Sequence, residues 1–157
     1  MLIRPAHLED LETIHKLNES VLPHVNSISM VDFEEFLKVS SFFVVIEVNE
    51  KIVAFMIVLG PAKTYKSENY QFYCNKYQSF DYVDRIVIDI KSQRNGYGRA
   101  LYDYLKEYSN EERITCEVNL NPPNPVSQEF HKVMGFSEVG QLNTKCGKLV
   151  SLLVLER

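Results

Sequence analysis

The sequence predicts an α/β protein in which helices cover one mixed β-sheet. Apolar segments of strand type alternate with amphipathic segments in the order β-α-α-β-β-β-α-β-α-β-β. Most segments end at glycine, proline or a short polar turn. A chain of 157 residues is long enough to bury one core and short for two.

The first part of the chain reads as a strand followed by two helices. Residues 2–4 form a short apolar strand, and apolar residues recur every three or four positions over residues 8–17. Residues 20–29 are irregular and contain Pro23. A second helix is expected over about residues 31–39.

The middle of the chain predicts a hairpin and then a long polar loop. Residues 41–48 and 52–59 are rich in β-branched and aromatic residues, and a short polar turn joins them. Residues 60–80 are polar and tyrosine-rich without a clear period, which indicates a functional or mobile loop. Strand character returns over residues 80–90.

The last part alternates helices and strands. A helix is expected from the glycines near residue 96 to about residue 108, with Tyr97, Leu101, Tyr104, Leu105 and Tyr108 on one face. A strand at residues 114–118 and a helix at about 126–134 follow, and Gly135 marks the end of that helix. Residues 136–142 and 148–155 are expected to close the chain as an antiparallel pair.

Composition limits the function classes. The net charge of −4 argues against a nucleic-acid partner, which would favour a basic protein. No apolar run reaches the length of a membrane span and no signal peptide is recognised, so we expect a cytoplasmic protein without a membrane partner. The three cysteines are widely spaced and no metal-binding spacing occurs, so we expect reduced thiols and no metal.

The stretch Gln93-Arg94-Asn95-Gly96-Tyr97-Gly98-Arg99-Ala100 is the most informative motif. It lies between an apolar strand and a helix, so unpaired backbone N–H groups gather at the start of that helix. These donors and the helix dipole form an anion site suited to a diphosphate. Glycine allows a phosphate to approach the backbone, since a Cβ would hold it away. Lys91, Arg94 and Arg99 add positive charge around the turn.

Two well-known phosphate motifs do not fit this stretch. A P-loop ends in Gly-Lys-Ser/Thr, whereas Gly98 is followed by Arg99 and Ala100. A dinucleotide fingerprint needs a third small residue where this chain has Leu101, and it normally opens a run of βαβ units.

A third motif does fit, because Gln93-x-x-Gly96-x-Gly98 resembles the acetyl-CoA pyrophosphate motif of the GNAT superfamily of N-acetyltransferases. A second block, from Asn124 through Ser127 and His131 to Gly135-Phe136, resembles that family's other signature. Segments 82–88 and 117–125 are similar to an uncharacterised bacterial branch. The resemblance implies one GNAT domain over residues 1–157, with a mixed, mostly antiparallel central sheet and about four flanking helices.

The resemblance also implies acetyl-CoA as cosubstrate and a set of residues that bind it. The strand before the glycine turn is similar to the family's pantetheine-binding strand, and the turn would hold the pyrophosphate. Asn124 would bind through its side-chain amide, or would simply cap the following helix. The residues expected to bind the cofactor are Ile86, Val87, Ile88, Gln93, Arg94, Asn95, Gly96, Tyr97, Gly98, Arg99, Asn124 and Ser127.

Acetyl transfer to an amine requires a neutral amine, a stabilised oxyanion and a proton for the departing thiolate. The resemblance implies that the backbone N–H of Ile88 polarises the thioester. His131 stands where many family members have a tyrosine that protonates the sulfur, and an imidazolium could do the same. Its alternative role is packing on the helix flank. Glu117 is the first candidate for the general base, with a substrate contact or a rim charge as its alternatives.

Three further residues are candidates for acceptor binding. Asp84 and Arg85 point to opposite faces of their strand, so one of them should be buried, and a structural pair is an alternative for Asp84. Glu19 lies in the first helix-loop region, where the superfamily recognises acceptors, or is a solvated helix-end charge. Asn119 completes the set.

The resulting hypothesis is an N-acetyltransferase that acts on a primary amine of a small molecule or peptide by direct attack in a ternary complex. The alternative is a regulatory module that binds CoA or acetyl-CoA without turnover. A plain interaction domain whose glycine turn binds nothing is a third class. A homodimer is a further option for the assembly, and the sequence does not identify the acceptor.

Overall fold

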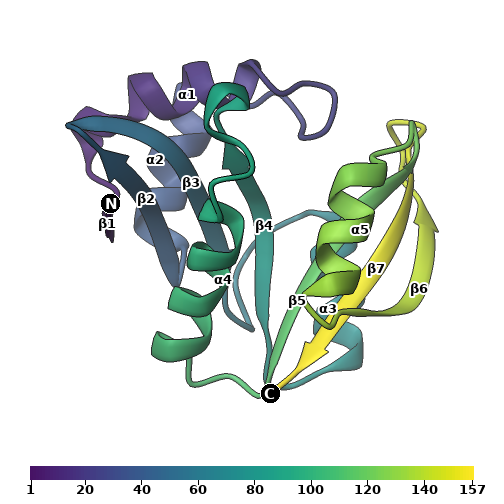
Figure 1. The fold of residues 1–157 in the computed structure, drawn as a ribbon. Coiled ribbons are helices and arrows are strands. Elements are labelled where there is room, and N and C mark those ends of the chain that lie inside the picture. Colours follow the sequence, from purple (N-terminus) through teal and green to yellow (C-terminus); the bar gives the residue numbers. More distant parts are fainter. The chain divides into compact units, whose positions relative to one another are not determined.

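The computed structural model describes all residues from Met1 to Arg157. Seven strands form one sheet in the order β1-β2-β3-β4-β5-β7-β6, and five α-helices accompany it. The pairs β1–β2, β2–β3, β5–β7 and β6–β7 are antiparallel, and β4 and β5 are parallel. This arrangement confirms the predicted α/β class and the mostly antiparallel sheet (Figure 1).

The elements follow the predicted order with one addition. The strands are β1 Leu2–Pro5, β2 Phe42–Val48, β3 Lys51–Leu59, β4 Asp81–Ile88, β5 Arg113–Asn121, β6 Ser137–Asn143 and β7 Leu149–Glu156. The helices are α1 Leu11–Glu19, α2 Met30–Val39, α3 Glu68–Lys76, α4 Tyr97–Tyr108 and α5 Pro125–Val133, with short 3-10 helices at Leu8–Asp10 and Ile90–Ser92.

Helix α3 corrects the prediction of a loop over residues 60–80, and it makes five α-helices instead of about four. Ser67 caps this helix by accepting a hydrogen bond from the backbone N–H of Tyr70. Its buried side chains, Tyr70 and Tyr73, carry hydroxyl groups, so the segment looked polar in sequence. Tertiary packing of these rings, rather than an apolar period, explains the helix.

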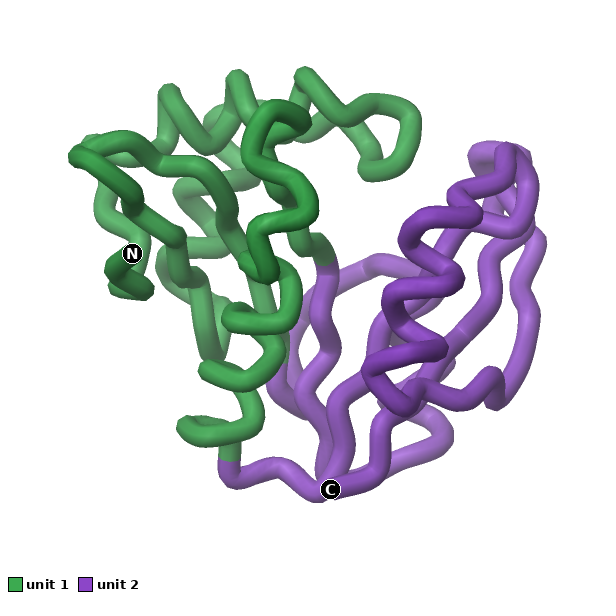
Figure 2. Tube along the Cα trace, in the orientation of Figure 1, with its two compact units in different colours: residues 1–59, 85–109 green, residues 60–84, 110–157 purple.

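The chain divides into two compact units, coloured separately in Figure 2. The first unit comprises Met1–Leu59 and Arg85–Ser109, and the second comprises Gly60–Asp84 and Asn110–Arg157. Strand β4 supplies residues to both, since the boundary falls between Asp84 and Arg85.

In the first unit, helices lie on both faces of β2 and β3. Phe33 of α2 contacts the rings of Phe43 and Phe55 on one face, at centroid distances of 6.5 and 6.1 Å. Helix α4 covers the other face with Leu101, Tyr102 and Leu105, all fully buried (Figure 1). Tyr108 is 54% exposed, although the sequence pattern places it on the same helix face as the buried Leu101 and Leu105. Tyr102 is fully buried.

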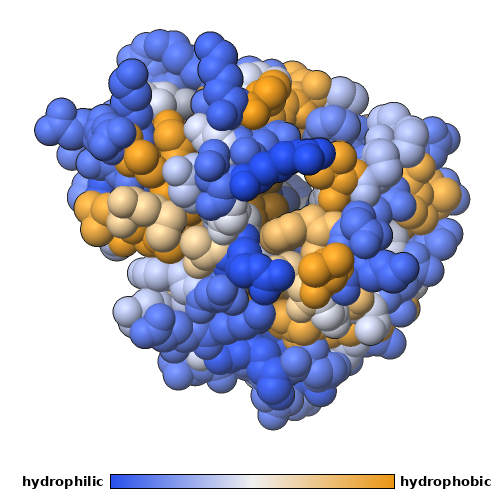
Figure 3. Space-filling model, in the orientation of Figure 1, coloured by the Kyte–Doolittle hydropathy of each residue, from blue (hydrophilic) through white to orange (hydrophobic).

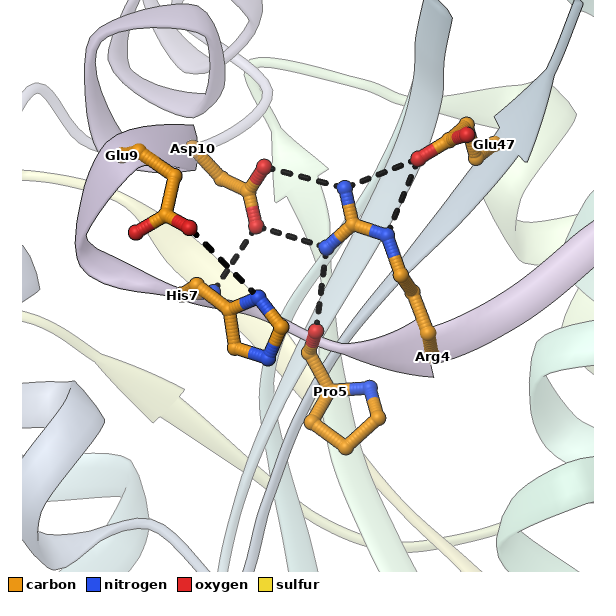
Figure 4. Close-up of polar contacts among 6 residues, drawn as sticks. All are labelled: Arg4, Pro5, His7, Glu9, Asp10 and Glu47. Carbon is orange, nitrogen blue, oxygen red and sulfur yellow. Dashed lines mark hydrogen bonds and ion pairs between the residues drawn. The ribbon is translucent and has the colours of Figure 1, made fainter. Parts of the chain in front are cut away.

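An ionic cluster fixes the start of the first unit (Figure 4). Arg4 of β1 donates two hydrogen bonds to the Asp10 carboxylate, at 2.7 and 3.0 Å, and its Nε donates to Glu47 of β2 at 2.9 Å. Asp10 also accepts from the backbone N–H of His7 at 2.8 Å. The hydrogen bond from Arg4 lowers the pKa of Asp10, so this carboxylate is charged at neutral pH.

In the second unit, α3 and α5 lie on opposite faces of β5 and β7 (Figure 1). Tyr70 and Tyr73 of α3 pack against Phe80 and Tyr82, with ring centroids 5.5 to 6.2 Å apart. The Tyr73 hydroxyl donates to the carbonyl of Cys116 at 2.6 Å and lies 3.0 Å from the carbonyl of Leu153. The tyrosines of this segment therefore form a core.

No helix is both long and apolar enough to cross a membrane. On the face shown in Figure 3, apolar residues form separate patches among hydrophilic ones.

Candidate active site

The glycine turn lies in the first unit, after β4 and the short 3-10 helix Ile90–Ser92. Gly96 has φ +79°, a left-handed conformation that favours glycine, and a Cβ built there would meet no atom within 4 Å. Asn95 braces the turn by donating its side-chain N–H to the carbonyl of Ser92 at 2.9 Å. The turn therefore needs glycine for its backbone angle and leaves open space beside it.

Helix α4 starts at this turn without a side-chain cap. Its first intrahelical bond runs from the N–H of Ala100 to the carbonyl of Gly96 at 3.0 Å. The N–H groups of Tyr97, Gly98 and Arg99 precede that bond and have no acceptor within the helix. Together with the helix dipole they form an anion-binding position.

Positive charge surrounds the turn. The side chains of Lys91, Arg94 and Arg99 are exposed, as is that of Gln93. The structure thus brings the predicted pyrophosphate-binding residues Gln93, Arg94, Asn95, Gly96, Tyr97, Gly98 and Arg99 together in one turn.

The end of β4 holds the predicted pantetheine segment. Ile86 and Ile88 are half-buried and Val87 is buried, as expected for side chains that alternate across a strand. The backbone N–H of Asp89 donates to the carbonyl of Val53 at 2.8 Å, which ties the exit of β4 to β3. The predicted pantetheine segment therefore ends shortly before the glycine turn, with the 3-10 helix Ile90–Ser92 between the two.

Asn124 and Ser127 lie in the second unit, at the start of α5. The Asn124 side chain accepts a hydrogen bond from the backbone N–H of Ser127 at 3.3 Å, and Pro125 is the first helical residue. The capping role considered for Asn124 is therefore confirmed. This bond engages the amide oxygen of Asn124.

His131 is buried on α5, with 3% exposure. Its Nδ1 lies 2.7 Å from the carbonyl oxygen of Ser127, and since a carbonyl only accepts, Nδ1 carries the proton. Phe130 and Phe136 contact the imidazole edge-on, at 5.1 and 5.2 Å. Burial lowers the pKa of His131, although the bond to Ser127 opposes this shift. A neutral imidazole with its proton on Nδ1 is thus the resting form.

Glu117 accepts a hydrogen bond from the Tyr82 hydroxyl at 3.0 Å. Tyr82 is fully buried in the second unit, and burial, followed by the charge of Glu117, raises the pKa of its phenol well above the usual value. Tyr82 therefore remains a neutral donor, and it orients the Glu117 carboxylate.

The remaining candidates for acceptor binding lie apart along the chain. Asp84 accepts from the Tyr65 hydroxyl at 2.5 Å, and Asn119 is buried with its carbonyl accepting from Gln128 at 3.0 Å. Glu19, in the first unit, accepts from the Ser27 hydroxyl at 2.7 Å. Glu19 is the last residue of α1 and thus ties that helix to the loop that follows, and its side chain is 28% exposed.

The structure shows the contacts of two residues that the sequence did not single out as site residues. Arg85 is 7% exposed, which confirms that one of the pair Asp84 and Arg85 is buried. Tyr65, placed in a presumed loop, donates to Asp84. The alternation of side chains on β4 signalled the first, whereas nothing local in the sequence signalled the second.

A cavity of about 230 Å³ lies beside α5 in the second unit. Val118, Leu120, Gln128, Lys132, Glu138 and Ser151 are among the residues that line it. It includes none of the predicted catalytic or cofactor residues, so it is not part of the predicted site.

Solved structures share this fold, and several of them are named acetyltransferases. The chain is similar to smu.2055 of Streptococcus mutans UA159, with 20% identity, a TM-score of 0.77 and 99% of each chain covered. It is similar to a ribosomal-protein-alanine N-acetyltransferase of Brucella melitensis, with 17% identity, a TM-score of 0.75 and all of each chain covered. It also resembles yncA of Salmonella typhimurium, a putative acetyltransferase solved with acetyl-CoA, with 16% identity, a TM-score of 0.74 and 99% and 93% covered.

The fold is therefore shared with proteins named acetyltransferases. A model of the acetyltransferase (GNAT) family matches residues 8–136, and the chain therefore belongs to this family. Comparison with curated proteins gives no match.

Proposed function

We propose that this protein transfers an acetyl group from acetyl-CoA to a primary amine of a small molecule or peptide, by direct attack in a ternary complex. The observation that carries the proposal is the uncapped start of α4 behind the left-handed Gly96, with open space where a Cβ would stand. Family membership adds the donor chemistry.

The first unit fits the pyrophosphate and pantetheine parts of acetyl-CoA. The first-turn N–H groups of α4 would donate to the diphosphate, and Arg94 and Arg99 would add charge. The backbone of Ile86, Val87 and Ile88 would pair with the pantetheine as an added strand does. In the second unit, Ser127 and the side chain of Asn124 are proposed as further contacts to the cofactor.

Acetyl transfer from the thioester requires stabilisation of the oxyanion and transfer of protons from the amine and to the sulfur. We assign the backbone N–H of Ile88 to the developing oxyanion and Glu117, oriented by Tyr82, to removal of the amine proton. The proton on the sulfur is assigned to His131. Because burial favours the neutral ring with Nδ1 engaged by Ser127, His131 must first take a proton at Nε2 before it can give one.

The acceptor is proposed to contact Glu19, Asp84 or Asn119. Carboxylates suit a cationic amine before it loses its proton. Two of the similar structures are ribosomal-protein-alanine N-acetyltransferases, whose names indicate peptide acceptors. An amino-terminal alanine peptide therefore belongs in the set of acceptors to be tried.

Several wider expectations accompany this proposal. Residues 1–157 are proposed to act as one GNAT domain without a resident metal, in the cytoplasm and with reduced cysteines. We also propose that the protein can form a homodimer.

A thiol-release assay over amines, polyamines, amino acids and short peptides tests the proposal. We expect acetyl-CoA to be consumed with one class of primary amine, and mass spectrometry to show a gain of one acetyl group on that amine. Binding of acetyl-CoA without acetylation of any acceptor would contradict turnover. Absence of binding would contradict the whole proposal.

The second candidate is a CoA-binding regulatory module. The observation that favours it is His131, a buried neutral imidazole where many family members carry a tyrosine. This candidate predicts acetyl-CoA affinity that is unchanged in His131→Ala and no acetylated product from any amine.

A further inference from the structure

Arg85 occupies an unusual place for a charged residue, because it is almost fully buried in β4 beneath the loop between α1 and α2. Its Nη1 donates to the side-chain oxygen of Asn18 at 3.0 Å and to the backbone carbonyl of Asn26 at 3.1 Å. The guanidinium also lies 5.8 Å from the ring centroid of Phe36. One arginine therefore joins β4, α1, α2 and their connecting loop.

Asn18 completes a triangle with these groups. It is fully buried on α1, and its Nδ2 donates to the carbonyl of Asn26 at 3.2 Å. The Asn26 carbonyl thus accepts from both Arg85 and Asn18. Residue 26 itself is exposed, so the contact holds a surface loop by its backbone.

The two ends of the loop, residues 20–29, are held as well. The Ser27 hydroxyl donates to Glu19 at 2.7 Å. At the other end, Ser29 caps α2 through the backbone N–H of Asp32 at 3.2 Å, and Asp32 accepts from the backbone N–H of Ser29 at 2.9 Å. Without regular secondary structure, this segment depends on such side-chain bonds for its shape.

Burying a guanidinium is unfavourable unless hydrogen bonds compensate for the lost hydration. An aliphatic side chain at this β4 position would carry no such penalty. The charged group is therefore best explained by what it holds, the backbone of the loop. Hydrogen bonds from a charged donor are stronger than those between neutral groups, so they help to keep such a segment in one conformation.

We propose that Arg85 is a positioning residue that fixes the loop of residues 20–29 for the acceptor amine. The role of the loop in binding the acceptor rests on the proposed function. The contacts that hold the loop are those of this structure. Arg85 directly precedes Ile86–Ile88 on β4, so the same strand presents the thioester segment and positions the acceptor loop. Arg85 contacts neither substrate and acts through the Asn26 carbonyl.

Hydrogen exchange tests the structural half without any ligand. Arg85→Met keeps an apolar stem but removes the donors, and we expect amides of residues 20–29 to exchange about ten times faster. Arg85→Lys should restore part of the protection. Asn18→Asp keeps an acceptor for Arg85 and removes the donor to Asn26, so it should loosen the loop while the fold stays intact.

Arg113→Met is the matched control, because Arg113 is a structural arginine of the second unit, 4.7 Å from the Tyr77 ring centroid. It should leave exchange over residues 20–29 unchanged. Equal loosening throughout the first unit in Arg85→Met, or none in the loop, would overturn the proposal.

Steady-state kinetics test the functional half with the amine found in the thiol-release screen. In Arg85→Met we expect the KM for the amine to rise about tenfold, with the KM for acetyl-CoA within about twofold of wild type. An unchanged amine KM would overturn the acceptor role. If wild type binds acetyl-CoA but shows no turnover, both the proposed function and the acceptor role fail, whereas the exchange data still decide whether Arg85 holds the loop.

Discussion

The two units of this protein carry their functional groups in different ways. In the first unit the glycine turn presents backbone N–H groups at an exposed helix start. In the second unit His131 and Tyr82 are buried in a packed core, and Tyr82 donates a hydrogen bond to the half-buried Glu117. Backbone donors depend on local conformation, whereas buried side chains depend on neighbours from distant parts of the chain. The two units should therefore respond differently to substitution.

The largest effect is expected in the second unit, from His131→Gln. Loss of a proton-transferring group should lower kcat about 100-fold, with acetyl-CoA affinity nearly unchanged. Because burial lowers the pKa of His131 and the proposed proton transfer requires the imidazolium, wild-type kcat should fall as the pH rises through a midpoint below about 6.5. A kcat that rises over this window would contradict the role of His131 as the acid. Turnover unaffected by the substitution would leave His131 with a packing role.

Asp10→Asn tests whether bonds between side chains contribute to the stability of the first unit. Loss of the charged bonds to Arg4 should lower the free energy of unfolding by about 2 kcal/mol at pH 7. The folded-state pKa of Asp10 is lowered, so the stabilisation is present above about pH 4 and is lost as the pH falls through that lower value. Urea unfolding of both proteins at several pH values should show the difference shrinking in acid. A difference independent of pH would rule out the ion pair as its source.

Gly96→Ala and Gly147→Ala form a matched pair for the backbone claim. Both glycines have left-handed φ angles, +79° and +84°, with no atom within 4 Å of a Cβ. Each substitution should cost about 1 kcal/mol of stability through backbone strain. Only Gly96→Ala should also weaken acetyl-CoA binding, by about tenfold, because its methyl group would occupy the space of the phosphate. Equal affinity of the two variants for acetyl-CoA would contradict the proposal that the glycine turn binds this ligand.

Ser29→Ala should produce the smallest effect of the four. It removes the cap of α2, which is worth about 1 kcal/mol, and frees the exit of the acceptor loop. Thermal unfolding should report the stability loss, and acetyl-CoA binding should stay unchanged. Weaker binding would show that this loop contributes to the donor site.

Sequence periodicity was sufficient for nearly all elements, because strands β1 to β7 and helices α1, α2, α4 and α5 have clear apolar patterns. It failed at α3, where the buried face is made of tyrosines. It also placed Tyr108 on one helix face with Leu101 and Leu105, although Tyr108 is exposed. Tyrosine occurs both in cores and on surfaces, so the spacing of tyrosines alone does not identify the buried face of a helix.

The glycine turn was predictable because its chemistry is local. Gly96 needs a left-handed φ and α4 needs a cap, and both can be inferred from neighbouring residues. Arg85 and Tyr65 could not be assigned partners, because Asn26 and Asp84 are 59 and 19 residues away along the chain. Motifs therefore reveal the donor site, whereas side-chain partners require the fold.

The most direct test of the account compares acetyl-CoA with S-acetylpantetheine by calorimetric titration into wild type and Gly96→Ala. S-acetylpantetheine carries the thioester but no pyrophosphate. If the glycine turn binds the pyrophosphate, wild type should bind acetyl-CoA at least about 100-fold more tightly, and the difference should shrink in Gly96→Ala. Equal affinity of wild type for the two ligands would contradict the assignment of the glycine turn.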